Sequence, residues 1–412
     1  MNRLPIATRR DFLARGLGLI GVSTVLPDYL LRTSLAAPEP VNDRVLVVIQ
    51  MSGGNDSISS LVPFGHAEYG KMRNLTRIKD EEVIKLDSEL GLHPRLHGFK
   101  ELLAQGAFAA VPGVGYPNPN YSHFTATDIW HAADPRGRDL KYGWIGRALD
   151  VGFKGNPDPQ LAMAVGSGQA PLAIEGQEHP GLSFYQPDAF RFKGDHGDKN
   201  RAALYAKFNA PAAQPLADTL SFVTRTAVNA NACSQRIREL ATGYKSQTEY
   251  PATELGNNLK VIAGLIVGGL STRAYYTFQG GYDTHSGQRD AHNNLMGQLN
   301  DAVVAFQADL AKQGHAKRVL TFTTSEFGRR VQENGTGGTD HGAGGVSFVF
   351  GPGIKPGIHG KHPSLTDLEG GGGGSLKFST DFRSLYATVL EKWLGIPSEP
   401  VIGKYPLLDI IA

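Results

Sequence analysis

The chain has 412 residues, with 41 Lys and Arg against 39 Asp and Glu, 41% hydrophobic residues and one cysteine. Its composition is close to the globular average, which argues against disorder, and a net charge of +2 excludes a general basic surface, so we expect no nucleic-acid partner. The single cysteine, Cys233, excludes an internal disulfide and any cysteine-rich zinc or iron–sulfur site.

The N-terminus has the layout of a twin-arginine export signal. Arg9 and Arg10 precede a weakly apolar run over residues 16–26, which is too short for a transmembrane helix of about 20 residues. We therefore predict a signal over residues 1–36, export by the twin-arginine machinery to the periplasm or outside the cell, and no stable transmembrane anchor. An amphipathic first helix of the folded domain is the alternative.

The mature protein is expected to be nearly neutral. Residues 1–36 hold five Arg and two Asp, so their removal leaves 36 basic and 37 acidic residues, a net charge of −1. The twin-arginine route carries proteins that are already folded, which fits an exported protein without disulfides. We predict that residues 37–412 form a single domain.

Strands and helices alternate along this domain. The continuous apolar run 44–51 has strand length and suits a strand buried on both faces of a parallel sheet. Further expected strands are 107–114, 273–278, 319–324 and 346–350, and expected helices are 94–105, 255–270, 290–312 and 381–394. The alternation predicts an α/β fold with a mainly parallel central sheet and helices on both faces.

Two other segments carry structural predictions. An apolar stripe over residues 216–240 includes Cys233, which we interpret as a buried structural thiol. The glycine run 370–374 predicts a flexible surface loop, because no strand–loop–helix frame surrounds it.

Polar side chains gather where the expected strands end, and ligands of open α/β sheets bind at such ends. The candidates are Asp56, Ser122, His123, Asp283, His285, Glu326 and His341. Together they offer carboxylate oxygen and imidazole nitrogen, a mixture that favours zinc, manganese or iron over calcium. We predict a site for one or two divalent metal ions, zinc or manganese.

Each candidate also has a plain structural alternative. Asp56 can hydrogen-bond its own turn, and Ser122 can cap a helix. Asp283 and His285 have a spacing that suits shared metal ligation or an ordinary turn. Glu326 can form an ion pair with neighbouring arginines, and His341 can lie in a merely flexible loop.

Several motifs support a family resemblance. They are Gly53-Gly54-Asn55-Asp56, Gly113 to Phe124, Gly281-Tyr282-Asp283-Thr284-His285, Ser325-Glu326-Phe327-Gly328-Arg329 and Gly338-Thr339-Asp340-His341-Gly342. In these segments the chain resembles the exported bacterial family catalogued as domain of unknown function 1501. That family in turn looks like a branch of the alkaline phosphatase and sulfatase superfamily.

The resemblance implies a fold and a set of roles. The fold is expected to be alkaline-phosphatase-like, with Ser122 as the nucleophile at a helix N-terminus. The implied metal ligands are Asp56, Asp283, His285, Glu326 and His341. Superfamily members commonly place His directly after the acidic ligand, but Phe327 stands there in this chain. That departure implies either a single metal or a loss of activity.

The implied function is a periplasmic metal-dependent hydrolase of a phosphate or sulfate ester. Ser122 would attack phosphorus or sulfur in line. His123 would donate to the leaving group, unless it is a packing or capping residue. The planar guanidinium of Arg329 would bind the substrate anion, unless it is a surface arginine.

The expected partner is a small anionic ester, with a slight preference for a carbohydrate ester, because aromatic residues near the expected site would suit sugar stacking. These residues are Tyr116, Tyr121, Trp130, Tyr142 and Trp144. The alternative function is a non-catalytic binding or assembly protein with a degenerate metal site. An exported redox enzyme lacks support, since the sequence has no dinucleotide fingerprint.

Overall fold

The computed structural model describes residues 43–137, 141–154, 158–190, 200, 233–370 and 374–412. The predicted export signal lies outside these residues. So do residues 216–232 of the apolar stripe and residues 371–373 of the glycine run.

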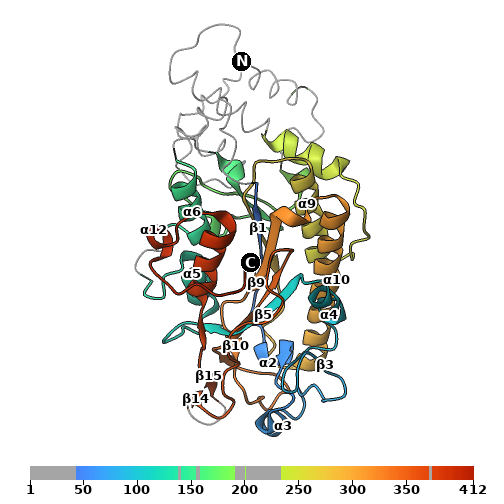
Figure 1. The fold of residues 1–412 in the computed structure, drawn as a ribbon, viewed down its shortest axis with the longest axis vertical. Coiled ribbons are helices and arrows are strands. Elements are labelled where there is room, and N and C mark those ends of the chain that lie inside the picture. Colours follow the sequence, from blue (N-terminus) through green and yellow to red (C-terminus); the bar gives the residue numbers. More distant parts are fainter. Residues whose placement is uncertain (1–42, 138–140, 155–157, 191–199, 201–232, 371–373) are drawn as a thin grey trace, which may run out of the picture.

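A large sheet runs through the centre of the molecule (Figure 1). Its strands are β1 Val45–Met51, β5 Phe108–Gly115, β6 Ala162–Val165, β7 Leu182–Phe184, β8 Ala274–Gln279, β9 Val319–Thr324, β12 Gly345–Phe350, β13 Gly357–Ile358 and β16 Thr380–Asp381. Their order is β13-β5-β12-β9-β1-β8-β6-β7, with β16 also pairing with β5. Strand β12 is antiparallel to β5 and β9, and the other pairs are parallel. The predicted mainly parallel sheet is confirmed.

Helices cover both faces of this sheet, as predicted (Figure 1). One face carries α4 His97–Ala104, α9 Glu254–Val267 and α10 Gln288–Lys312, and the other carries α5 His123–Ala132, α6 Trp144–Gly152, α11 Phe382–Thr388 and α12 Glu399–Ile402. A π-helical segment, Val389–Leu394, continues α11 to Gly395, which has a positive φ of 70°.

The first strand shows why the two cores form. Val45 and Val47 of β1 pack into the core under α9 and α10, and Leu46 and Val48 pack into the core on the opposite face. Every residue of β1 is buried. Alternation of side chains along a strand thus turns one continuous apolar run into a wall shared by both cores.

Short elements cluster at the carboxyl ends of the strands (Figure 1). They are α2 Ser57–Ser60, β2 Leu61–Val62, α3 Ala67–Met72, β3 Ile84–Lys85, β4 Gly91–Leu92, β10 Gly328–Arg329, β11 His341–Gly342, β14 Leu368–Glu369 and β15 Ser375–Leu376. The sequence did not predict these elements, because strands and helices this short show no periodic pattern. Single-turn 3-10 segments cover Pro159–Leu161, Leu172–Ile174, Pro187–Ala189 and Ala316–Arg318.

Cys233 packs against the core under α9 and α10, in line with its predicted structural role. Burial raises the pKa of its thiol to about 12, so it stays protonated at neutral pH. Among the helices of the described residues, none is both long and apolar enough to cross a membrane.

Candidate metal centre

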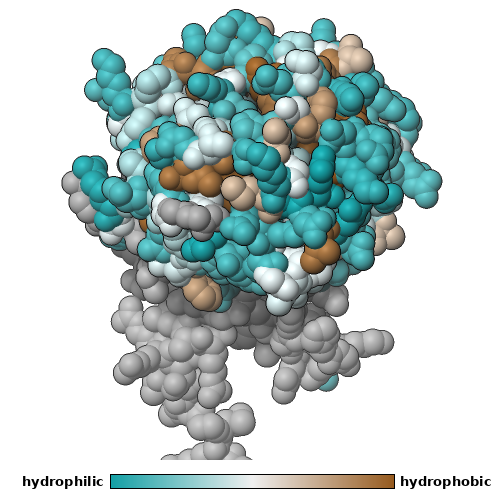
Figure 2. All heavy atoms as spheres, turned by 90° about the horizontal axis from the view of Figure 1, so that it is seen from below, coloured by the Kyte–Doolittle hydropathy of each residue, from teal (hydrophilic) through white to brown (hydrophobic). Residues whose placement is uncertain are grey.

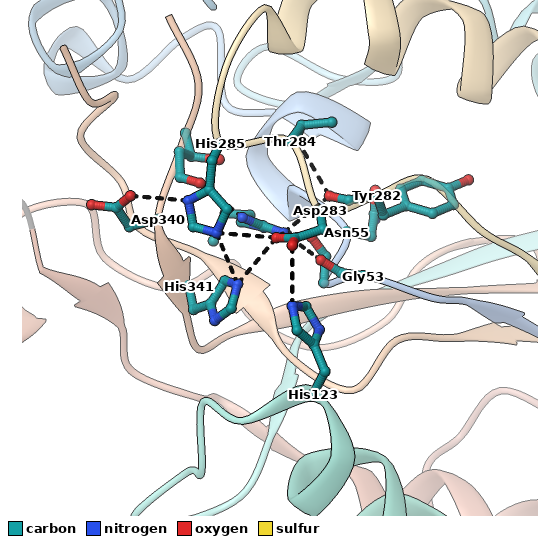
Figure 3. Close-up of polar contacts among 12 residues, drawn as sticks. Gly53, Asn55, His123, Tyr282, Asp283, Thr284, His285, Asp340 and His341 are labelled. Carbon is teal, nitrogen blue, oxygen red and sulfur yellow. Dashed lines mark hydrogen bonds and ion pairs between the residues drawn. The ribbon is translucent and has the colours of Figure 1, made fainter. Parts of the chain in front are cut away.

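Loops from several strands meet at one edge of the sheet. Strands β8, β1 and β9 are parallel neighbours, so the loops that follow them emerge side by side. The loop after β8 carries Asp283 and His285, and the hairpin of β10 and β11 carries His341. His123 opens helix α5 and reaches the same point from the other side (Figure 3).

The carboxylate of Asp283 lies at the centre of this cluster (Figure 3). The Nε2 atoms of His285 and His341 are each 3.1 Å from Asp283 Oδ1, and His123 Nε2 is 3.4 Å from Oδ2. The two Nε2 atoms of His285 and His341 are 3.1 Å apart. One ligand atom each from His123, Asp283 and His341 lies within 4.8 Å of the others.

The opposite ring nitrogens of the three histidines are also engaged. Nδ1 of His123 contacts Glu326 Oε1 at 2.8 Å, Nδ1 of His285 contacts Asp340 Oδ1 at 3.2 Å, and Nδ1 of His341 contacts the carbonyl oxygen of Tyr121 at 2.9 Å. Carboxylate and carbonyl oxygens accept hydrogen bonds, so we assign the ring proton to Nδ1. A neutral ring then presents an unprotonated Nε2 to the centre of the cluster.

This assignment leaves an electrostatic problem that a cation would solve. Lone pairs of three Nε2 atoms face a carboxylate and, for His285 and His341, each other. Two ligand atoms at about 2.0–2.1 Å from a tetrahedral zinc ion lie about 3.3 Å apart. The separations of the three Nε2 atoms from the Asp283 carboxylate, and of the His285 and His341 Nε2 atoms from each other, are 3.1 to 3.4 Å and match this spacing. The residues present therefore fit a divalent metal ion.

The supporting contacts resemble those of established metal sites. Metal-binding histidines commonly donate their second ring N–H to a carboxylate or a backbone carbonyl, which fixes the ring and raises its basicity. Glu326 and Asp340 supply the carboxylates here. Three imidazoles and one carboxylate are a donor set that suits zinc or manganese better than calcium.

Arg329 holds the central carboxylate and is not available to a substrate. Its guanidinium is buried and donates to the backbone carbonyls of Gly53, Gly54, Tyr282 and Thr339 and to Asp283 Oδ1, the last at 2.7 Å. The predicted role of Arg329 in binding the substrate anion is therefore not supported, because these acceptors occupy its donors. Burial raises the pKa of Asp283, but the hydrogen bond and the positive charge of Arg329 outweigh it and lower that pKa to about 2.

Asp56, predicted as a metal ligand, is placed elsewhere. It forms a bidentate ion pair with Arg73, with distances of 2.6 and 3.1 Å, and both side chains are buried. Ser59 and Gln288 donate to the same carboxylate. Burial raises the pKa of Asp56, and Arg73 more than offsets this and lowers it to about 2. The Asp56 carboxylate is thus already paired with the Arg73 cation.

Glu326, also predicted as a ligand, stands one step behind the cluster. Its Oε1 accepts from Gly53 N and from His123 Nδ1, both at 2.8 Å. Phe327 lies beside it, with its ring centroid 4.9 Å from that of His123 and 4.6 Å from that of His341. Where the superfamily commonly has a histidine, this chain has an aromatic ring that packs against two of the cluster histidines.

Ser122 is the N-cap residue of α5, but its side chain makes no capping hydrogen bond and is exposed. It lies between two residues of the centre, since the Tyr121 carbonyl anchors His341 and His123 joins the cluster. His123 itself was predicted as a donor to the leaving group. The structure engages both of its ring nitrogens with carboxylates and places it among the potential ligands.

Sequence analysis missed two contributors, Asp340 and Arg73. Asp340 directly precedes His341 in the motif, so its position alone indicates that it lies near the site. Arg73 lies in a loop after α3 without any pattern, and only the tertiary structure brings it to Asp56. Of the aromatic residues expected at the mouth, Tyr116, Trp130 and Trp144 belong to the core.

Comparison with protein families gives one match. Residues 190–402, which are 213 of the 412, match the family described as protein of unknown function (DUF1501). The chain belongs to this family. The matched region includes Asp283, His285, Glu326 and His341, whereas Ser122 and His123 lie before it. Among curated protein sequences, none matches the chain.

Solved structures similar to this family member include hydrolases and their relatives. A protein in the alkaline phosphatase superfamily from Vibrio parahaemolyticus is 9% identical, with a TM-score of 0.40, over 92% of this chain and 78% of that one. A sulfatase from Pseudoalteromonas sp. is 12% identical, with a TM-score of 0.36, over 88% and 70% of the two chains. An alkaline phosphatase from the Antarctic bacterium TAB5 is 11% identical, with a TM-score of 0.30, over 76% of this chain and 94% of that one. Scores and identities this low carry no argument about activity.

Proposed function

We propose that this protein is an exported, metal-dependent hydrolase of phosphate or sulfate esters. The observation that carries the proposal is the convergence of three Nε2 atoms on the Asp283 carboxylate, with each Nδ1 held by an oxygen acceptor. A bound zinc or manganese ion would supply a Lewis acid for the ester oxygens and lower the pKa of a nearby hydroxyl or water. The resemblance of this family to the alkaline phosphatase and sulfatase superfamily supports the same class of reaction.

Ser122 is the proposed nucleophile. Its side chain leaves the first amide groups of α5 uncapped, and amides at a helix N-terminus favour an anion such as phosphate or sulfate. The Ser122 oxygen forms a bond to phosphorus or sulfur while the bond to the ester oxygen breaks. The Ser122 proton is released to solvent, and the departing oxygen takes up a proton to give the alcohol. Water then cleaves the serine ester, releases the inorganic anion and restores the hydroxyl.

The second candidate is a binding or assembly protein that has kept the metal centre without catalysis. The ion pair of Asp56 with Arg73 favours it, because this pair removes one predicted ligand from the centre. The two candidates share the metal and differ in turnover. We favour the hydrolase, since the Ser122 hydroxyl makes no capping hydrogen bond and Ser122 adjoins His123.

Metal analysis and hydrolysis assays test the proposal together. Purified protein should hold about one zinc or manganese ion per chain, and it should cleave 4-nitrophenyl phosphate or sulfate. His341→Ala should lose the metal, and Ser122→Ala should keep the metal and lose hydrolysis. A content of less than about half a metal ion per chain would exclude the proposed metal centre. Bound metal without hydrolysis of either ester would favour the binding or assembly protein. Activity retained by Ser122→Ala would show that Ser122 is not the nucleophile.

A further inference from the structure

Exposed apolar side chains gather around the candidate centre. Among the described residues, five large apolar side chains are exposed: Leu75 58%, Tyr121 38%, Phe124 85%, Tyr185 55% and Leu407 37%. Exposed apolar side chains that are scattered singly are normal on a protein surface. Here, however, Tyr121 and Phe124 flank Ser122 and His123 in the chain, and Leu75 lies beside the loop that supports His285. These three residues, Leu75, Tyr121 and Phe124, are called the apolar rim.

Tyr121 and Phe124 lie at the start of α5, on either side of Ser122 and His123. The Tyr121 carbonyl binds His341. The Tyr121 hydroxyl contacts Ser375 Oγ at 3.1 Å, and its ring centroid is 6.3 Å from that of Phe327, so this ring is held in place. Phe124 lies in the first turn of α5 and is almost fully exposed.

Leu75 borders the centre on the side of His285. A Cβ atom added at Gly337 would lie 3.5 Å from Leu75 Cδ1, so Leu75 lies beside the loop around residue 337. That loop supports the histidine, since Asn334 and Thr336 both donate to the carbonyl of His285. The face of the molecule at the strand ends is otherwise largely hydrophilic, with separate apolar areas (Figure 2).

We infer that the apolar rim binds the organic portion of the substrate, and that this portion is an aromatic or similarly apolar group. The inference rests on the proposed function, because the metal centre and Ser122 would hold the anionic end of the same ester. The side chains of Phe124 and Leu75 offer no hydrogen bonds to sugar hydroxyls. Tyr116, Trp130 and Trp144 are buried in the core. The rim therefore favours an apolar ester over the carbohydrate ester expected from the aromatic content.

Matched esters isolate the organic group. Benzyl and ethyl phosphate, or the corresponding sulfates, have alcohol leaving groups of similar acidity, and glucose 6-phosphate or 6-sulfate adds a polar arm. The wild type should prefer the benzyl ester to the other two. Phe124→Ala should lower kcat/KM for benzyl relative to ethyl ester by about three- to tenfold, the range of one aromatic contact, mainly through KM.

Leu407→Ala is the matched control for loss of an exposed apolar side chain. Leu407 adjoins Leu408, whose amide donates to Thr388 in the helical layer, away from the strand ends. This variant should leave the benzyl-to-ethyl ratio unchanged. Equal losses for both esters in Phe124→Ala, or a wild-type preference for the glucose ester, would overturn the inference.

Binding gives a readout that does not need turnover. Calorimetric titration of the zinc-loaded protein with benzylphosphonate and methylphosphonate should show tighter binding of the benzyl compound, and Phe124→Ala should remove most of the difference. If the wild type hydrolyses no ester but keeps this difference, the proposed function fails and the rim stands. If both phosphonates bind equally well, the rim fails even where hydrolysis is observed.

Discussion

At the scale of single residues, the hydrogen bond that Nδ1 donates decides whether Nε2 of each histidine can bind a metal. His123 has Glu326 behind it, His285 has Asp340, and His341 has a backbone carbonyl. Each contact fixes a ring orientation and leaves Nε2 free for a metal. Without these acceptors the imidazole rings would be free to rotate.

Removal of Glu326 should therefore weaken metal binding without removing a ligand. We expect Glu326→Ala to reduce zinc affinity by about 10- to 100-fold, the usual effect of losing such a partner. Glu326→Gln should lose less, because the amide oxygen can still accept from His123 Nδ1. Competition with a chromophoric chelator measures both affinities, and equal affinities for Glu326→Ala and the wild type would show that Glu326 does not orient His123.

Asp56 should be a stability residue. Asp56→Asn leaves Arg73 as a buried charge without a counter-charge, so we expect a loss of about 3–5 kcal/mol in the free energy of unfolding. The metal content per folded chain should not change. Urea unfolding and metal analysis of the folded fraction check both points; loss of metal with unchanged stability would restore Asp56 as a ligand.

At the scale of elements, the centre depends on close contact between the loops after β1 and β8. Gly53 has a φ of +118°, and a Cβ atom there would lie 2.4 Å from the backbone nitrogen of Asp283. Only glycine allows this approach, since other residues rarely adopt such a φ and would collide with the backbone. Gly53 thus sets the position of the central carboxylate.

Gly53→Ala should displace the Asp283 loop and lower zinc affinity by at least about tenfold, as misplaced supporting groups do at metal sites. Gly280→Ala is the matched control, because a Cβ at Gly280 would meet nothing within 4 Å. The chelator competition assay compares the two variants. Equal affinities would mean that the loop after β8 tolerates the collision.

At the scale of the whole molecule, buried neutral histidines should make stability depend on pH. Burial lowers the pKa of His93 to about 2, and it lowers the pKa of His131 to about 3. Their folded pKa values lie below the unfolded value of 6.5, so the unfolded state binds more protons between these values. Their stabilising contribution is therefore complete above pH 6.5 and declines as the pH falls toward the folded pKa values.

The free energy of unfolding should accordingly fall below pH 6.5, by up to about 1.4 kcal/mol per pH unit for each such histidine. His131 lies in a buried hydrogen-bond network with Gln50 and Tyr276. His131→Gln should reduce the slope by about one proton. Urea unfolding from pH 7 to 5 with a chelator present measures it, and an unchanged slope in this variant would contradict the assignment.

Export is also a property of the whole chain and stays a prediction. Replacing Arg9 and Arg10 by Lys should retain the protein in the cytoplasm, because the twin-arginine machinery reads the arginine pair. Fractionation of cells that express the wild type and this variant provides the measurement. Equal amounts in the periplasm would remove the twin-arginine assignment.

Sequence periodicity alone determined the layers of this fold. Apolar runs such as Val45–Met51 and the stripe of Phe382–Thr388 can be buried only in a strand or a helix, so their patterns predicted the central sheet and its covering helices. Position at a strand end was likewise enough to indicate Asp283, His285 and His341. Local pattern carries this information because it reflects which face of each element leaves water.

Only the tertiary structure decided which of these polar residues share a site. Asp56 follows its strand as Asp283 does, yet Arg73 from another loop neutralises it. Arg329 belongs to the motif of residues 325–329 but is turned inward, and His123 joins the cluster from a helix that precedes Asp283 by 160 residues of sequence. Charge pairing and ring orientation depend on contacts between segments that are distant in the sequence, and no local sequence pattern records such contacts.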